Sequence, residues 1–284
     1  MGLPTSYAAP HNSQEPEQHS GPNHGGQKVG CMTTKRLILL IAFAGIVCAC
    51  SLQVVKAGSP ATVASTGTTS AATVKGTVKL EGVAPEARPI NMSADPICAK
   101  QHREPVLSQD VEVDGKGDLG NVIVFVADGL QGQVFDPPTQ PATIDQRGCM
   151  YEPHVLAIRA NQPLDVKNDD PTSHNIHPLP TNNREWNKSE PPGSRAEETF
   201  PREEVAIPVK CNIHPWMRGY VAVFKHPFFA VTTKDGSFDL ANLPAGTYTI
   251  KAWHEKLGTA TQIITVAANE TKTIQFLFKS TSAK

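Results

Sequence analysis

The sequence predicts an all-β protein, and three features of the chain support this fold class. Strand-like segments recur at short intervals after residue 73, and apolar and polar residues alternate within them, as in strands with one buried face. The chain contains 24 Pro and 21 Gly, which supply the turns between such segments. No long apolar pattern with a helical period lies outside the first sixty residues, which argues against a helical bundle.

The expected strands fall on either side of a long loop at residues 171–199. Gly, Pro, Asn and Asp separate the strands, and this arrangement is typical of a β-sandwich or a barrel. We expect the strands at residues 74–80, 111–113, 122–126, 156–159, 164–166, 205–209, 220–224, 238–240, 248–252, 263–266 and 274–278.

Residues 1–57 are expected to be a leader rather than part of the fold. Residues 1–31 are polar and rich in His, Gln, Gly and Pro, so we interpret them either as unfolded leader or as a misassigned start. Basic residues, an apolar run and small residues up to Ala57 follow, which is typical of a bacterial export signal. A lipid anchor at Cys50 is the alternative to cleavage after Ala57. Residues 58–72 are rich in Ser, Thr and Ala and are the expected flexible linker.

Charge and cysteine usage limit the class of protein and its compartment. The chain has 26 Lys+Arg and 27 Asp+Glu, whereas a nucleic-acid binder needs a basic face, so nucleic acid is not an expected partner. Three of the cysteines follow the leader, and an odd number in an exported protein leaves at least one unpaired. For a protein of the periplasm or cell envelope we expect a disulfide between Cys98 and Cys149, with Cys211 free for another role. The alternative is that Cys98 and Cys149 are free and buried.

The most informative motif is Cys211-Asn-Ile-His214-Pro-Trp-Met217. It places a thiol, an imidazole and a thioether within one short loop at the end of an expected strand. Two His and one Cys with a more distant Met form the ligand set of blue copper sites. The second His has to come from elsewhere, and His174, followed by Asn175, is the candidate.

Strand register supports a buried cysteine in this motif. Alternate residues of a strand share one face. Cys211 therefore faces the core if the apolar residues two, four and six positions before it face the core. Those residues are Val205, Ile207 and Val209. A Cys-x-x-His pair alone also occurs in zinc sites, so a zinc or purely structural site is the alternative.

Residues 151–224 resemble the cupredoxins, the small type 1 copper proteins of the amicyanin and plastocyanin kind. The resemblance implies a Greek-key β-sandwich around one mononuclear copper ion. The motifs that carry it are, in chain order, Tyr151-Glu-Pro, Asn168, His174-Asn175, the Cys211-to-Met217 loop and Gly219-Tyr-Val-Ala-Val223.

The resemblance assigns a role to each candidate residue. Asn175 is expected to link the two ligand loops by hydrogen bonds. His177 is a rival to His174, which we prefer because the family motif has Asn directly after the ligand His. The implied copper ligands are His174, Cys211 and His214 in the equatorial plane and Met217 in the axial position.

The resemblance also implies a function. Type 1 copper proteins carry single electrons, here between periplasmic redox partners, a donor and an acceptor such as a c-type cytochrome or an oxidoreductase. One site with four protein ligands leaves no position for a substrate, so we do not expect an enzyme. His214, on an exposed loop beside Pro215 and Trp216, is the expected exit for the electron, with an apolar patch there for docking.

Residues 226–284 resemble a different module. The segment from 232 to 250, with Asp235-Gly236 and Leu243-Pro-Ala-Gly246 as turns, is similar to the transthyretin-like, regulatory-like β-sandwich found beside carboxypeptidases. We therefore expect a copper domain at 73–225 and this module at 226–284, although residues 74–82 are also candidates for its first strand. The alternative function is a cell-envelope binding module whose copper or zinc site serves structure or storage.

Overall fold

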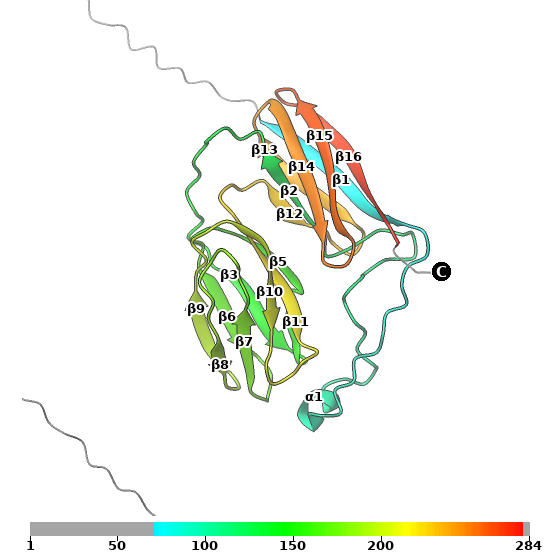
Figure 1. Cartoon of the computed structure of the whole chain (residues 1–284), viewed down its shortest axis with the longest axis vertical. Helices are drawn as coiled ribbons and strands as arrows, with labels where there is room; N and C mark the ends of the chain where they lie inside the picture. Colours follow the sequence, from blue (N-terminus) through cyan, green and yellow to red (C-terminus); the bar gives the residue numbers. More distant parts are fainter. Residues whose placement is uncertain (1–70, 281–284) are drawn as a thin grey trace, which may run out of the picture. The chain divides into compact units, whose positions relative to one another are not determined.

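The computed structural model describes residues 71–280, which all belong to one compact unit. The predicted all-β class is confirmed, because the described residues form sixteen strands and one five-residue helix (Figure 1). The expected leader, Cys50 and nearly all of the expected linker lie outside the described residues. Within residues 71–280 no helix is both long enough and apolar enough to span a membrane.

The strands form two β-sandwiches, and one is inserted into the sequence of the other. The framing sandwich consists of a sheet with strand order β13-β1-β16 and a sheet with order β12-β2-β14-β15. Its strands are β1 (Ala72–Glu81), β2 (Ile123–Asp128), β12 (Phe229–Val231), β13 (Ser237–Leu243), β14 (Gly246–His254), β15 (Gly258–Val266) and β16 (Thr271–Lys279).

The inserted sandwich consists of sheets with strand orders β5-β11-β10-β7-β8 and β4-β3-β6-β9. Its strands are β3 (Ala142–Arg147), β4 (Met150–Glu152), β5 (Val155–Arg159), β6 (Leu164–Asn168), β7 (His174–Pro178), β8 (Lys188–Glu190), β9 (Arg195–Glu198), β10 (Glu204–Lys210) and β11 (Arg218–Phe224).

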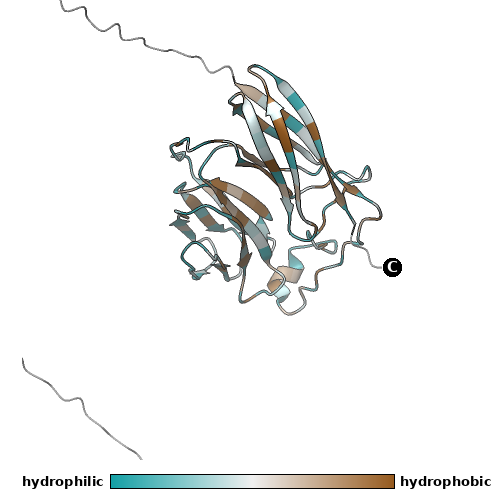
Figure 2. Ribbon diagram, turned by 45° about the horizontal axis from the view of Figure 1, so that its top comes forward, coloured by the Kyte–Doolittle hydropathy of each residue, from teal (hydrophilic) through white to brown (hydrophobic). Residues whose placement is uncertain are grey.

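Alternating hydropathy builds the core of the framing sandwich. Along β1, buried residues alternate with exposed or half-buried ones, and Figure 2 shows the same change of colour along the strands. Gly76, in the middle of β1, allows β16 to approach closely, since a Cβ atom there would lie 2.1 Å from the Ile274 carbonyl oxygen. β1 and β16 pair in parallel along nine residues.

The N-terminal strands differ from the predicted domain boundaries. β1 pairs with β13 and β16, and β2 pairs with β12 and β14, so both belong to the framing sandwich and not to the domain expected at 73–225. The expected strand at 111–113 is replaced by an isolated bridge between Val113 and Leu119. The apolar faces of β1 and β2 are buried in the same core as β14 and β16, which explains their placement.

β10 carries side chains toward the core of the inserted sandwich. Ile207, Val209 and Cys211 lie in that core, as their shared parity predicts. Val205 does not, because it packs in a separate cluster. The register shifts within the first half of β10, where Ala206 has a φ of 65°, so the prediction for Val205 is corrected by a β-bulge.

The segment between β1 and β2 carries the helix α1 (Pro96–Lys100). Asp95 caps its N-terminus, accepting hydrogen bonds from the backbone N–H groups of Ile97 at 2.8 Å and Cys98 at 3.4 Å. Cys98 forms a disulfide with Cys149, which lies between β3 and β4. The segment is thereby fixed to the inserted sandwich.

Candidate metal centre

Two neighbouring strands of the inserted sandwich supply the residues of the candidate centre. His174 is the first residue of β7, and Cys211 directly follows β10. The loop that continues to β11 is closed on itself, because the Met217 N–H donates to the His214 carbonyl at 2.9 Å and the Cys211 N–H donates to the Met217 carbonyl at 3.1 Å. The backbone therefore holds Cys211, His214 and Met217 in one tight turn.

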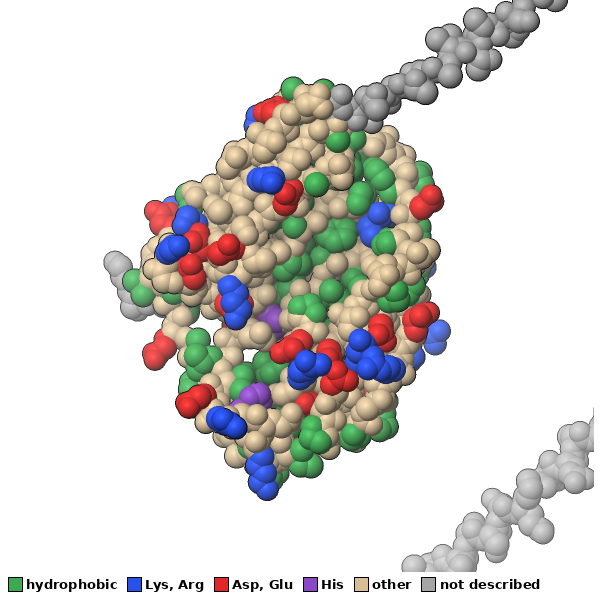
Figure 3. All heavy atoms as spheres, turned by 180° about the vertical axis from the view of Figure 1, so that it is seen from behind, with side chains coloured by type: hydrophobic (Ala, Val, Ile, Leu, Met, Phe, Trp, Pro, Cys, Tyr) green, Lys and Arg blue, Asp and Glu red, His purple; other side chains and the backbone are tan. Residues whose placement is uncertain are grey.

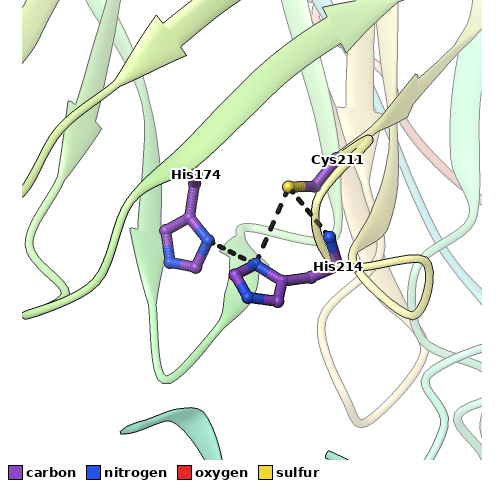
Figure 4. A group of neighbouring side chains, drawn as sticks. All are labelled: His174, Cys211 and His214. Atoms are coloured by element: carbon purple, nitrogen blue, oxygen red, sulfur yellow. Dashed lines mark hydrogen bonds between the residues drawn. The ribbon is translucent and has the colours of Figure 1, made fainter. Parts of the chain in front are cut away.

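Three side chains converge inside the core (Figure 4). The Nδ1 atoms of His174 and His214 lie 2.8 Å apart, and Cys211 Sγ lies 3.8 Å from His214 Nδ1. One possible ligand atom from each of the three lies within 4.8 Å of the others. The exposed fractions of His174, Cys211 and His214 are 0%, 2% and 2%, so the group is sealed from water.

Two carboxylates determine which nitrogen of each ring faces the centre. His174 Nε2 lies 2.8 Å from Asp170 Oδ2, and His214 Nε2 lies 2.9 Å from Asp95 Oδ2. An ionised carboxylate only accepts hydrogen bonds, so each Nε2 carries the proton and each neutral ring has its lone pair on Nδ1. When both rings are neutral, two nitrogen lone pairs and the Cys211 sulfur therefore face each other in a buried space.

Asp170 is held as an anion by its surroundings. Burial would raise its pKa, but hydrogen bonds from His174 and from the backbone N–H groups of Cys149 and Gly148 lower the pKa below the usual aspartate value. Both backbone bonds are 2.7 Å long. A buried carboxylate behind a ligand imidazole fixes the ring orientation and increases the basicity of the ligand nitrogen.

The contact between His174 and Cys211 shifts the pKa of both groups. Burial would lower the pKa of His174, but its bonds to Asp170 and Cys211 raise the pKa to about 9. Burial would raise the pKa of the Cys211 thiol, but the His174 interaction and backbone N–H groups lower it. A proton on His174 therefore satisfies the facing Nδ1 atoms, and a bound metal would displace it.

Met217 is the fourth ligand that the sequence predicts. It is fully buried and lies in the same core cluster as Cys211, and its backbone closes the ligand loop. A thiolate, two imidazoles and a thioether are soft and borderline donors that suit copper. The residues of the centre therefore fit a copper ion.

Asn175 connects the two loops. Its Oδ1 accepts a hydrogen bond from the Asn212 backbone N–H at 2.7 Å and faces Cys211 Sγ at 3.4 Å. His177, the rival ligand, lies elsewhere, since its ring contacts Asn212 Oδ1 at 3.3 Å and Glu185 Oε1 at 2.7 Å. The structure thus groups the ring of His174, and not that of His177, with Cys211 and His214.

The surroundings of His214 contradict the expectation that its ring is exposed and serves as the exit for the electron. The side chain is 2% exposed, its Nε2 contacts Asp95 and lies 3.7 Å from Cys98 Sγ, and the Trp216 ring lies 4.9 Å away between centroids. The segment that carries α1 therefore covers the ring edge. This cover was not predictable, because nothing near Asp95 in the sequence indicates a partner 119 residues away.

Asp95 and Asp170 are the functional residues that the sequence analysis missed. No role was predicted for either of them. For Asp170, a position four residues before His174 in the same turn was an available signal. For Asp95, the only local signal was the Asp-Pro start of a short helix.

Comparison with known proteins gives similarity over about a third of the chain. No protein-family model matches the chain, and no curated protein matches it. A copper-containing nitrite reductase from Thermus scotoductus SA-01 is 20% identical over 34% of this chain and 26% of its own, with a TM-score of 0.29. A purple cupredoxin from Nitrosopumilus maritimus is 28% identical over 29% of this chain and 98% of its own, with a TM-score of 0.26. A reduced amicyanin variant is 19% identical over 35% of this chain and 97% of its own, with a TM-score of 0.27.

Proposed function

We propose that this chain is a type 1 copper protein that carries single electrons between redox partners. One observation supports this most strongly: two imidazole Nδ1 atoms and the Cys211 sulfur converge in a sealed core while a carboxylate holds the Nε2 atom of each ring. His174, Cys211, His214 and Met217 are the residues that would hold the copper. Bound copper supplies a one-electron couple.

The chain's own residues suit electron transfer better than substrate chemistry. Cys211 and Met217 are 2% and 0% exposed, and the ligand loop is closed by backbone hydrogen bonds. Asp170, Asp95 and Asn175 fix the orientation of the ligands from outside. Such a centre gives a substrate no open position, so our proposal includes no enzymatic activity.

Compartment and architecture are also part of the proposal. A disulfide between Cys98 and Cys149 suits an oxidising compartment, which supports export to the periplasm or cell envelope, with or without a lipid anchor. The redox partners would be soluble or membrane-bound proteins such as c-type cytochromes or oxidoreductases. We propose that the framing sandwich is a regulatory-like module with a structural role.

Replacing Met217 by Leu separates electron transfer from metal storage. The substitution keeps the volume of the side chain and removes the thioether. An electron carrier should keep its copper but show a raised reduction potential and a changed colour, because loss of an axial donor destabilises Cu(II) more than Cu(I). Voltammetry and visible spectroscopy of the copper-loaded protein measure both.

Met150→Leu is the matched control, because Met150 is also buried in this core but lies outside the ligand loop. It should leave the potential and the colour unchanged. A centre that serves storage or structure would instead lose copper or zinc affinity in Met217→Leu and show no reversible one-electron couple in either variant.

A further inference from the structure

The histidine side of the centre is closed to a partner protein. Asp95 accepts from His214 Nε2 at 2.9 Å, and the cap of α1 that contains Asp95 is fixed by the Cys98–Cys149 disulfide. Only 2% of the His214 surface is exposed. An electron that leaves by the His214 ring edge would have to cross this covering segment before it reached a partner.

The cysteine side borders a surface hollow. A hollow of about 370 Å³ lies at the junction of β10 and β11, and of the four proposed ligands Cys211 lines it whereas His174, His214 and Met217 do not. The Cys211 backbone continues directly into Lys210 and into exposed Asn212. Covalent bonds therefore connect the thiolate to the surface on this side. The other lining residues include Leu179, Pro208, Pro215 and Tyr220.

The charges of this hollow are basic. Lys210 and Arg218 face each other as register partners across β10 and β11, and both line the hollow. Among residues 71–280 neither of them forms an ion pair, and Arg218 Nε donates only to the Pro215 carbonyl at 3.2 Å. Elsewhere basic and acidic side chains lie side by side, in several places on the face shown in Figure 3. His177, which contacts Asn212, has its other ring nitrogen beside Glu185, so the Glu185 carboxylate is already bound there.

We propose that electrons pass through this Lys210–Arg218 hollow, and that it docks a redox protein whose contact surface carries carboxylates. The proposal rests on the proposed electron-transfer function. Two unpaired cations beside the backbone of a ligand cysteine attract an acidic partner to a side with a covalent path to the metal. The cover over His214 makes the hollow the route in place of the histidine edge.

Charge reversal tests the route with a small anionic oxidant. Ferricyanide takes one electron from the reduced, copper-loaded protein and becomes ferrocyanide, and stopped-flow absorbance follows the rate. We expect the Lys210→Glu/Arg218→Glu variant to react at least about tenfold more slowly at low ionic strength, with the difference shrinking as salt is added. Negative charge near copper lowers its potential and would by itself speed oxidation, so slowing has to come from docking.

Lys100→Glu/Arg103→Glu is the matched control. It makes the same change of net charge on the segment that carries α1, where both side chains are exposed. This variant should react within about twofold of the wild type. The proposal would be overturned if Lys100→Glu/Arg103→Glu slowed oxidation by ferricyanide as much as Lys210→Glu/Arg218→Glu does. It would also be overturned if only the control variant were slower.

A second measurement needs no copper. Hexacyanochromate(III), a paramagnetic anion that exchanges no electrons here, should broaden the amide signals of Lys210, Asn212 and Arg218 in the copper-free protein more than those of Lys100 and Arg103. Broadening centred on Lys100 and Arg103 would contradict the docking site. If the wild type shows no one-electron couple, the proposed function fails, and the copper-free broadening still decides where an anion docks.

Discussion

Asp170→Asn is expected to raise the reduction potential of bound copper and to weaken Cu(II) binding. An aspartate on the far side of an imidazole ring, at an effective dielectric constant of about 20, interacts with a metal charge by about 2 kcal/mol. Its loss corresponds to a shift of about 100 mV for a one-electron couple. Loss of a carboxylate behind a ligand His also costs about 10- to 100-fold in metal affinity. Voltammetry and competition with a Cu(II) chelator measure the two effects.

The local hydrogen bonds add to this effect. Asp170 accepts from three donors, the N–H groups of Gly148 and Cys149 and the Nε2 of His174, and an amide has one acceptor oxygen in place of two. Asp169→Asn is the control, because the neighbouring Asp169 is paired with Arg147 and its side chain is 35% exposed. A potential that moves equally in both variants, or falls in Asp170→Asn, would contradict the role of Asp170.

Removing the disulfide in Cys98→Ser/Cys149→Ser is expected to destabilise the metal-free protein strongly. The two cysteines are 51 residues apart, and closing a loop of this length accounts for about 4 kcal/mol of unfolding free energy in the chain-entropy model. For a domain of this size the loss corresponds to a decrease in Tm of about 10 °C. Urea unfolding followed by circular dichroism gives the free energy.

The third cysteine provides the comparison. Cys211 is free and buried, so Cys211→Ser in the metal-free protein changes one thiol without opening a loop and should lose much less stability. The Cys98→Ser/Cys149→Ser variant should also release the cover, so that the ring protons of His214 become accessible to solvent in NMR experiments. Equal stabilities of the two variants would show that the disulfide does not hold the segment.

The ligand loop was predictable because its information is local. Cys211, His214 and Met217 lie within seven residues, and the parity of Ile207, Val209 and Cys211 correctly placed the sulfur in the core. His174 required the Asn that follows it and the resemblance to the cupredoxins. The structure groups His174 with Cys211 and His214, and it buries Met217 in the same core cluster as Cys211.

The cover over the centre was not predictable because it depends on contacts distant in sequence. Asp95 and His214 are 119 residues apart. Motifs and hydropathy patterns compare residues that are close in sequence, so they do not indicate such a contact. The same limit applies to the assignment of β1 and β2, whose alternating residues fit either sandwich until the pairing with β14 and β16 is known.

Polar strands were a second source of error. The segment 171–199 was expected to be a loop, yet it contains β7, β8 and β9. β8 and β9 have the sequences Lys-Ser-Glu and Arg-Ala-Glu-Glu, which show no apolar alternation. They form strands because they pair with β7 and β6, so their structure comes from neighbours and not from propensity.

The visible and electron paramagnetic resonance spectra of the chain after addition of Cu(II) test the copper centre most directly. A thiolate in a trigonal copper site with two imidazoles should give an intense charge-transfer band and an unusually small copper hyperfine splitting. Both should disappear in Cys211→Ser, while Met150→Leu should keep them. A colourless protein, or an ordinary tetragonal copper spectrum that survives in Cys211→Ser, would contradict the proposed electron carrier.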